Sequence, residues 1–433
     1  MSVPDPRPSR GIDLRSMFRA LRHRNYRLFF FGQGISLVGT WMQQVAVGWL
    51  VYRMTSSPIW LGVVGFVGQI PTFLISPVAG VLADRHERRS LLIVTQVAAL
   101  LQASLLAFLV LSQRIQVWHV VALSAFLGII NSFDIPVRQS FTIEMVEERE
   151  DLGNAIALNS SMINAARLIG PSAAGLLIAW AGEGVCFFLN AVSYIPVVLS
   201  LCAMKVVARR LFIPEQRIWH ELREGLAYGF RSVPIRWILF ILSVVSLMGV
   251  AYPVLMPVFA KDVFRGGPHT LGFLMAMSGA GALAGALFLA ARRSVVGLGK
   301  VLARMAGLFG ISMIALSLSR SFSLSLLISW FSGFGMIVHT ASCNTILQTI
   351  VEEDKRGRVM SLYTMSFMGM APFGSLLAGG LAGRIGASLT IFFSGACCVA
   401  GAVVFLRKLP LVKAKIRPIY AQKGIIPEVV TGP

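Results

Sequence analysis

The amino-acid sequence predicts an all-α membrane protein in which twelve transmembrane helices form two pseudo-symmetric halves of six. Three observations support this fold class. Apolar residues make up 56% of the chain and the mean hydropathy is +0.74, whereas soluble domains contain about 45–50% apolar residues. The apolar residues gather in stretches that are long enough for a membrane helix, which needs about 20 residues. The second half of the chain also repeats the pattern of the first.

Each apolar stretch is expected to be a helix because hydrocarbon tolerates only a backbone whose hydrogen bonds are made within the segment. The first six spans are predicted at residues 28–52, 60–82, 91–111, 118–137, 154–180 and 185–204. The second six are predicted at residues 237–260, 271–291, 301–318, 324–350, 359–383 and 387–406. Trp60, Trp118, Trp180 and Trp237 fall at span ends, where aromatic belts are typical.

The basic residues predict the orientation, because loops rich in Lys and Arg stay in the cytoplasm. The amino-terminal tail, alternate loops and the carboxyl-terminal tail hold 32 of the 39 Lys and Arg residues, and the opposite loops hold six. We therefore expect both termini to be cytoplasmic. The net charge of +20 is mainly a topology signal. A nucleic-acid partner is not expected, because the chain has no basic soluble domain to bind one.

A shift of 205–210 residues aligns the two halves of the sequence, for example Gly62 with Gly272 and Gly175 with Gly380. Paired six-helix units are one plan of secondary transporters, although channels and membrane enzymes can also arise by duplication. The repeat predicts five regions: a cytoplasmic tail at 1–27, a first half at 28–204, a cytoplasmic linker at 205–236, a second half at 237–406 and a cytoplasmic tail at 407–433.

A polar segment, GVLADRHERRSLL at residues 80–92, separates the second and third spans. Its pattern Gly80-x-x-x-Asp84-Arg85-x-x-Arg88-Arg89 resembles the signature loop of the major facilitator superfamily, with Glu87 in place of a second glycine. A glycine lets helix ends approach, and a carboxylate can accept amide hydrogen bonds there. The resemblance implies that these five motif residues latch the two halves when the carrier faces outward. A solvated, topology-setting turn is the alternative.

A second motif lies in the fifth span. Gly170-Pro171-x-x-Ala174-Gly175 resembles the antiporter motif of the same superfamily, with Ala174 in place of a glycine. Small residues permit close helix contact, and proline removes one backbone hydrogen bond. Residues 36–62, 134–140 and 158–171 are similar to the branch called transmembrane secretion effectors, which contains the enterobactin exporter. The resemblance implies the fold and secondary transport, and it says little about the substrate.

Polar residues recur at helical spacing on the first span, at Gln33, Ser36, Thr40 and Gln44. We expect this stripe to face a central substrate cavity, with Ser243 and Ser246 opposite it on the seventh span. Further candidate cavity groups are Asn131, Asn164, Arg167, His339 and Asn344. The alternative is that these side chains bond neighbouring helices. Methionines of the eleventh span, Met360, Met365, Met368 and Met370, predict an adaptable apolar wall or ordinary packing.

Arg167 is the basic residue that we place within the body of a span, where an ionisable group is a functional candidate. It could bind an anionic or catechol-like group, or pair with Asp134. Proton antiport needs a group that titrates, and the first span holds no Asp or Glu. Asp134 and His339 are the proton-coupling candidates, with Glu144 or uncoupled facilitation as alternatives.

The sequence thus predicts a carrier of the bacterial inner (plasma) membrane that exports a small amphipathic molecule, siderophore or drug-like, by alternating access with proton antiport. An importer, a lysophospholipid-type flippase and an uncoupled facilitator are the alternatives. An enzyme is not expected, because HExxH, GxSxG and Walker motifs are missing. We expect no cofactor and no metal, with a small-molecule substrate, protons and the lipid bilayer as partners of a monomer.

Overall fold

The computed structural model describes residues 18–146, 148–204, 227–292 and 294–427, and every regular element in them is helical. The first half contains η1 (Arg19–Arg22), α2 (Arg24–Thr55), α3 (Pro58–Arg85), α4 (Arg88–Leu111), α5 (Val117–Glu144), η2 (Arg149–Asp151), α6 (Leu152–Ala181) and α7 (Glu183–Ala203). The second half contains α9 (Val233–Gly249), α10 (Ala251–Val258), the π-helix η3 (Phe259–Val263), α11 (Pro268–Ala290), α12 (Leu298–Leu318), α13 (Phe322–Ile350), α14 (Glu353–Phe367), α15 (Met370–Ile385) and α16 (Ala387–Gln422).

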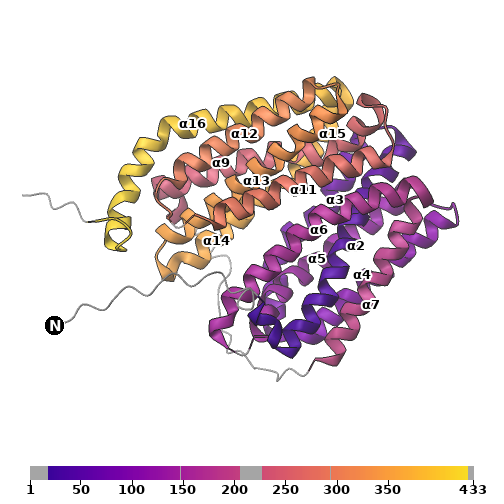
Figure 1. Ribbon diagram of the computed structural model, residues 1–433, viewed down its shortest axis with the longest axis horizontal. Coiled ribbons are helices and arrows are strands. Elements are labelled where there is room, and N and C mark those ends of the chain that lie inside the picture. The colour runs from indigo at the N-terminus through magenta and orange to yellow at the C-terminus, as the bar shows by residue number, and fades with distance from the viewer. Residues whose placement is uncertain (1–17, 147, 205–226, 293, 428–433) are drawn as a thin grey trace, which may run out of the picture.

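These helices form two bundles that meet at one end and diverge at the other (Figure 1). Helices α2 to α7 make one bundle and α9 to α16 make the other. Between the bundles, α3 packs against α15 and α6 packs against α11. Eleven spans within the described residues are long and apolar enough to cross a membrane, and the 32-residue α2 takes the remaining place. The predicted fold class is therefore confirmed.

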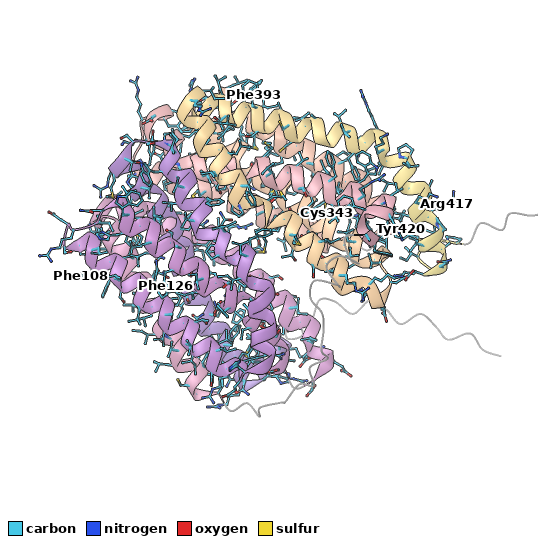
Figure 2. All side chains as sticks on the ribbon, turned by 180° about the vertical axis from the view of Figure 1, so that it is seen from behind. Phe108, Phe126, Cys343, Phe393, Arg417 and Tyr420 are labelled. Carbon is cyan, nitrogen blue, oxygen red and sulfur yellow. The ribbon has the colours of Figure 1, made fainter. Side chains whose placement is uncertain are left out.

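The outer surfaces of both bundles are covered by large apolar side chains. Phe108, Phe126 and Phe393 are 59%, 43% and 53% exposed, and Figure 2 shows them on the outside of their bundles. Water would penalise such surfaces, whereas lipid chains solvate them. The chain is a multi-pass membrane protein.

Two spans that the sequence predicted as continuous helices are interrupted. In the seventh span, α9 ends at Gly249 and α10 begins at Ala251, two residues before Pro253. In the eleventh span, α14 ends at Phe367 and α15 begins at Met370, two residues before Pro372. Proline cannot donate to the carbonyl four residues earlier and clashes with it. Pro253 and Pro372 lie in the first turns of α10 and α15, where a missing N–H is tolerated.

The last helix continues beyond the predicted span end at residue 406. Helix α16 runs to Gln422, and Figure 2 places Arg417 and Tyr420 on this extension. The extension is amphipathic, since its buried residues recur every three or four positions, at Leu409, Val412, Ile416 and Tyr420. Lys423 then donates to the carbonyls of Thr349 (2.8 Å) and Val351 (3.3 Å), which fixes the extension to the end of α13.

The segment before α2 is anchored to the connection between α5 and α6. The buried Asp151 carboxylate accepts a hydrogen bond from His23 Nε2 (3.0 Å) and pairs with Arg19 and Arg22. Burial opposes ionisation of Asp151, but the His23 hydrogen bond and the two arginines outweigh it and lower the pKa of Asp151. Part of the predicted tail 1–27 is thus structured, while residues 1–17, 205–226 and 428–433 of the predicted tails and linker lie outside the described residues.

Candidate functional site

A cavity of about 1410 Å³ lies between the two halves. Its walls come mainly from α2, α3, α5 and α6 of the first half and from α9, α10, α11, α13 and α14 of the second. Helices of both halves therefore build one shared site rather than two separate pockets, as expected for a site at the interface of repeats.

One end of the cavity is closed by direct backbone contact between helices. A Cβ placed on Gly175 of α6 would lie 2.9 Å from Cα of Gly272 in α11. A Cβ placed on Gly62 of α3 would likewise lie 2.9 Å from Cα of Gly379 in α15. Only glycine permits an approach this close, because any side chain would meet the backbone of the facing helix. We call this the closed end.

Polar side chains add a second connection at the closed end. The Tyr52 hydroxyl of α2 donates a hydrogen bond to Asp262 of η3. Lys261 lies 5.3 Å from the centre of the Tyr52 ring, and its Nζ lies 3.4 Å from Ser56 Oγ. These contacts join the first half to the second at the closed end.

At the opposite end, which we call the open end, the halves diverge (Figure 1). The cavity lining extends there to Gly357 and Arg358 near the start of α14. The turn between α3 and α4 and the end of α16 lie on this side, because each span reverses direction from the last. The cavity is therefore accessible from the end that carries α14.

Arg167 of α6 lines the cavity beside the interface of the halves. Its guanidinium lies 5.0 Å from the centre of the Trp41 ring, which is cation–π distance. Its Nε is buried without a hydrogen-bond partner, and within the described part of the chain no carboxylate pairs with it. The alternative that Arg167 pairs with Asp134 is wrong, since Asp134 pairs with Arg138 at 3.3 Å.

The charged groups of the lining are two arginines, Arg167 and Arg358, and no Asp, Glu, Lys or His belongs to the lining among the described residues. The other polar lining groups are neutral: Thr40, Gln43, Gln44, Gln69, Thr72, Ser76, Gln102, Ser124, Asn131, Ser246, Tyr252, Ser278, Ser332, Ser361 and Thr364. The described lining therefore combines two basic groups with neutral hydrogen-bonding groups that can donate and accept.

The structure places five predicted cavity residues on the lining: Thr40, Gln44, Asn131, Arg167 and Ser246. Six others are not among the lining residues: Gln33, Ser36, Asn164, Ser243, His339 and Asn344. Gln33 and Ser36 are buried in the part of α2 that packs on α7, where Gly32 approaches Val197. Three predicted methionines, Met360, Met365 and Met368, also line the cavity, whereas Met370 does not.

The two proton-coupling candidates both lie behind the cavity wall. His339 is fully buried, with Nδ1 3.0 Å from the carbonyl of Leu302. Asp134 is 5% exposed and accepts hydrogen bonds from Gln96 Nε2 (2.7 Å) and Thr95 Oγ1 (3.1 Å). Asp134 adjoins the lining residue Ile135 on α5, so it is the nearer of the two to the cavity along the chain.

The antiporter-like motif divides its contacts between two helices. Gly170 packs on α2, where a Cβ would meet Trp41 and the carbonyl of Val38. Pro171 lines the cavity, and Gly175 makes the α11 contact described above. The motif thus runs from the Trp41 wall to the closed end.

The latch residues are described in part. The structure does not describe the surroundings of Gly80 or the side chains of Asp84 and Arg85. Arg88 forms an ion pair with Glu144 of α5, and Arg89 donates to the carbonyls of Leu201 (2.7 Å) and Cys202 (2.8 Å) at the end of α7. Both described arginines therefore bond within the first half.

Sequence reasoning missed Trp41 and a buried amide network. Asn190 Nδ2 donates to Gln43 Oε1 (2.8 Å), and Gln43 Nε2 donates to Gln102 Oε1 (3.1 Å), which connects α7, α2 and α4. Gln43 and Gln102 both reach the cavity lining. The available signal was their polarity inside apolar spans, which indicates a buried partner.

The family of transmembrane secretion effectors matches residues 15–424. The staphyloferrin A transporter of Staphylococcus aureus is 26% identical over 89% of this chain and 97% of its own length. The macrolide efflux protein A of Streptococcus pyogenes is 24% identical, over 90% and 99% of the two chains, and the enterobactin exporter of Shigella flexneri is 26% identical, over 91% and 93%.

Similar folds occur among solved structures. A bacterial homologue of the iron transporter ferroportin, solved in an inward-facing state, superposes with a TM-score of 0.66 at 18% identity, over 89% of this chain and 98% of its own. The two-bundle architecture, the shared cavity and the match over nearly the whole chain agree with one another. This chain belongs to the transmembrane secretion effectors, a family of transporters within the major facilitator superfamily.

Proposed function

We propose that this chain is a secondary active exporter that carries a small amphipathic molecule across the membrane by alternating access. The observation that carries this proposal is the shared cavity, which is accessible at the open end and closed by two glycine contacts at the other. Rocking the halves about the cavity would exchange access between the two sides.

The proposed setting is the inner (plasma) membrane of a bacterium, with both termini in the cytoplasm and the protein acting as a monomer. The distribution of Lys and Arg supports this orientation, and the relatives named above are bacterial. In this orientation the cavity faces the cytoplasm, so cargo enters from inside the cell. The order of steps is then loading, closure of the open end and release at the closed end.

Proton antiport supplies the driving force in this proposal, with Asp134 as the proton carrier. Asp134 is supported over His339 because it adjoins the lining residue Ile135, whereas His339 is fully buried against the carbonyl of Leu302. Protonation would release Arg138, and a change in that ion pair could be transmitted along α5 to Asn131 on the lining. Uncoupled facilitation is the outcome if flux through the parent protein does not respond to a pH gradient.

The loop at residues 80–89 serves in this proposal as the latch of the outward-facing state. Support comes from the open end, where the described arginines Arg88 and Arg89 bond within the first half. Closure of this end would bring α14 of the second half towards the loop. Asp84 would then contribute to a contact between halves, by the resemblance of its motif.

The relatives support two kinds of cargo, a siderophore or a macrolide-like drug. The experiment is uptake of enterobactin and of erythromycin into inverted membrane vesicles, with and without an imposed pH gradient. Saturable, gradient-driven accumulation of unmodified compound supports an exporter. Accumulation with the opposite vesicle polarity would make it an importer, and movement of lysophospholipid alone would make it a flippase.

Matched variants separate the steps. Asp134→Asn should abolish the response to the pH gradient, whereas His339→Gln should keep it. Asp84→Asn should lower flux without lowering the amount of protein in the membrane. Full gradient-driven flux in Asp134→Asn would refute the assigned carrier, and full flux in Asp84→Asn would refute the latch.

A further inference from the structure

We propose that the cargo is an anion and that Arg167 is the group that binds it. This inference rests on the proposed function, because it names the substrate class of the transport cavity. Three features support it: the incomplete hydrogen bonding of Arg167, the lack of acidic groups in the described lining, and the pairing of described carboxylates with other protein groups.

Arg167 has unused bonding capacity in a place where a charge is costly. Its Nε is buried without a hydrogen-bond partner, and its described contact is the face of Trp41 at 5.0 Å. A guanidinium has five N–H donors in a planar fork that matches a carboxylate or a catecholate. A charge inside a membrane normally pairs with another group. An anionic cargo supplies the partner that the described residues do not.

The rest of the cavity reinforces the preference. Arg358 is the second charged lining residue, and acidic groups are missing from the lining that the structure describes. The low-dielectric walls focus the positive potential of Arg167 into the cavity. A cationic cargo would meet this potential without a carboxylate to bind it, which is how a site rejects the wrong charge.

Three carboxylates among the described residues already have protein partners. Asp134 pairs with Arg138, Glu144 pairs with Arg88, and Asp262 accepts from Tyr52 at the closed end. Recruiting any of them to a cationic cargo would break one of these contacts. Arg167 therefore has no carboxylate partner among the described residues.

The apolar wall fits the remainder of an amphipathic anion. Met275, Met336, Met360, Met365 and Met368 line the cavity with Phe73 and Phe367. Methionine side chains adapt to apolar shapes and contact aromatic rings favourably. We therefore expect the anionic head to lie at Arg167 and Trp41, and the apolar body to lie against the methionines.

The test compares fluorescein with rhodamine 123, two dyes that share a xanthene skeleton and carry opposite charge. Fluorescence anisotropy measures their binding to the purified full-length protein in neutral detergent at low salt, with protein-free micelles as the blank. Fluorescein should bind at least tenfold more tightly than rhodamine 123. Arg167→Gln should weaken fluorescein binding at least tenfold, and Arg320→Gln, an exposed arginine outside the cavity, should leave it unchanged.

Arg167→Lys is a second variant that tests the inference even if Arg167→Gln does not fold. It keeps the charge but loses the planar fork, so it should still prefer fluorescein while binding it more weakly than the parent protein. Equal or tighter binding of rhodamine 123, no binding of either dye, or unchanged fluorescein binding by folded Arg167→Gln would overturn the inference.

Transport of the same dyes separates this inference from the proposed function. Selective fluorescein binding without flux of any compound in vesicles would refute the exporter and leave the anion site standing. If rhodamine 123 shows saturable flux that is the same in Arg167→Gln as in the parent protein, the chain is a transporter and the anion site is refuted.

Discussion

Gly175 of α6 and Gly272 of α11 meet without a side chain between them, and Gly62 of α3 and Gly379 of α15 repeat this contact. In the internal repeat Gly62 aligns with Gly272, and Gly175 aligns with Gly380, the residue next to Gly379. One pair lies on each side of the closed end, so the same device is used twice. The closed end therefore consists of two glycine contacts reinforced by two polar contacts, of Tyr52 with Asp262 and of Lys261 with Ser56.

Gly379→Val should weaken the closed end and reduce transport. A Cβ at Gly379 would lie 2.7 Å from Cα of Gly62, and such overpacking costs about 1–3 kcal/mol. The population closed at that end should fall about 5–150-fold relative to the open one. Gly380→Val is the matched control, because a Cβ there meets nothing within 4 Å. Equal flux in the two variants would contradict the role given to the glycine pair.

Tyr52→Phe should shift the protein towards opening at the closed end. The lost hydrogen bond to Asp262 is worth about 1 kcal/mol, and the ratio of the two states should change about fivefold. Spin labels at Arg114→Cys and Arg320→Cys, on the two halves at this end, should show a larger fraction of long distances. The exposed Cys202 and Cys397 are first replaced by serine. An unchanged distance distribution would show that this hydrogen bond does not hold the closed end together.

Acid should destabilise the protein through Asp151. The folded state lowers the pKa of Asp151 below its usual value of about 3.9. The stabilisation is therefore complete above about pH 4 and is lost as the pH falls through the folded pKa. Asp151→Asn should melt at a lower temperature at pH 7 and lose less on acidification, as followed by intrinsic fluorescence in detergent. Glu150→Gln is the control, and parallel acid profiles for Asp151→Asn and the parent would contradict the assignment.

Anion export should respond to voltage as well as to pH. Each negative charge that moves through 100 mV contributes about 2.3 kcal/mol, which is about a 50-fold ratio of concentrations. In liposomes with a potassium diffusion potential and no pH gradient, fluorescein should accumulate on the positive side. Asp134→Asn should keep this response while losing the response to pH. Accumulation that is indifferent to voltage would mean that the cargo carries no net charge across.

The sequence predicted the helices well because burial in lipid is a property of composition over a whole span. The sequence did not predict the breaks near Pro253 and Pro372, because hydropathy averaged over a whole span does not register a single proline. It also did not predict the full extent of α16, whose end is held by Lys423 through contacts with α13 that depend on tertiary packing.

The cavity was predicted in part for the same reason. Helical spacing correctly put Gln33, Ser36, Thr40 and Gln44 on one stripe, but packing decides which part of the stripe is exposed. Helix α7 covers the first turns, and only Thr40 and Gln44 reach the lining. The contact of Arg167 with Trp41 could not be read from spacing, since the two residues lie on different helices.

The two glycine contacts also constrain how the halves can move. Two rigid bodies that touch at two separated points can rotate about the line through those points without losing either contact. Gly175–Gly272 and Gly62–Gly379 define such an axis across the closed end. In the proposed transport cycle, the open end would narrow by rotation about this axis, and both glycine contacts would stay closed until the halves separate there.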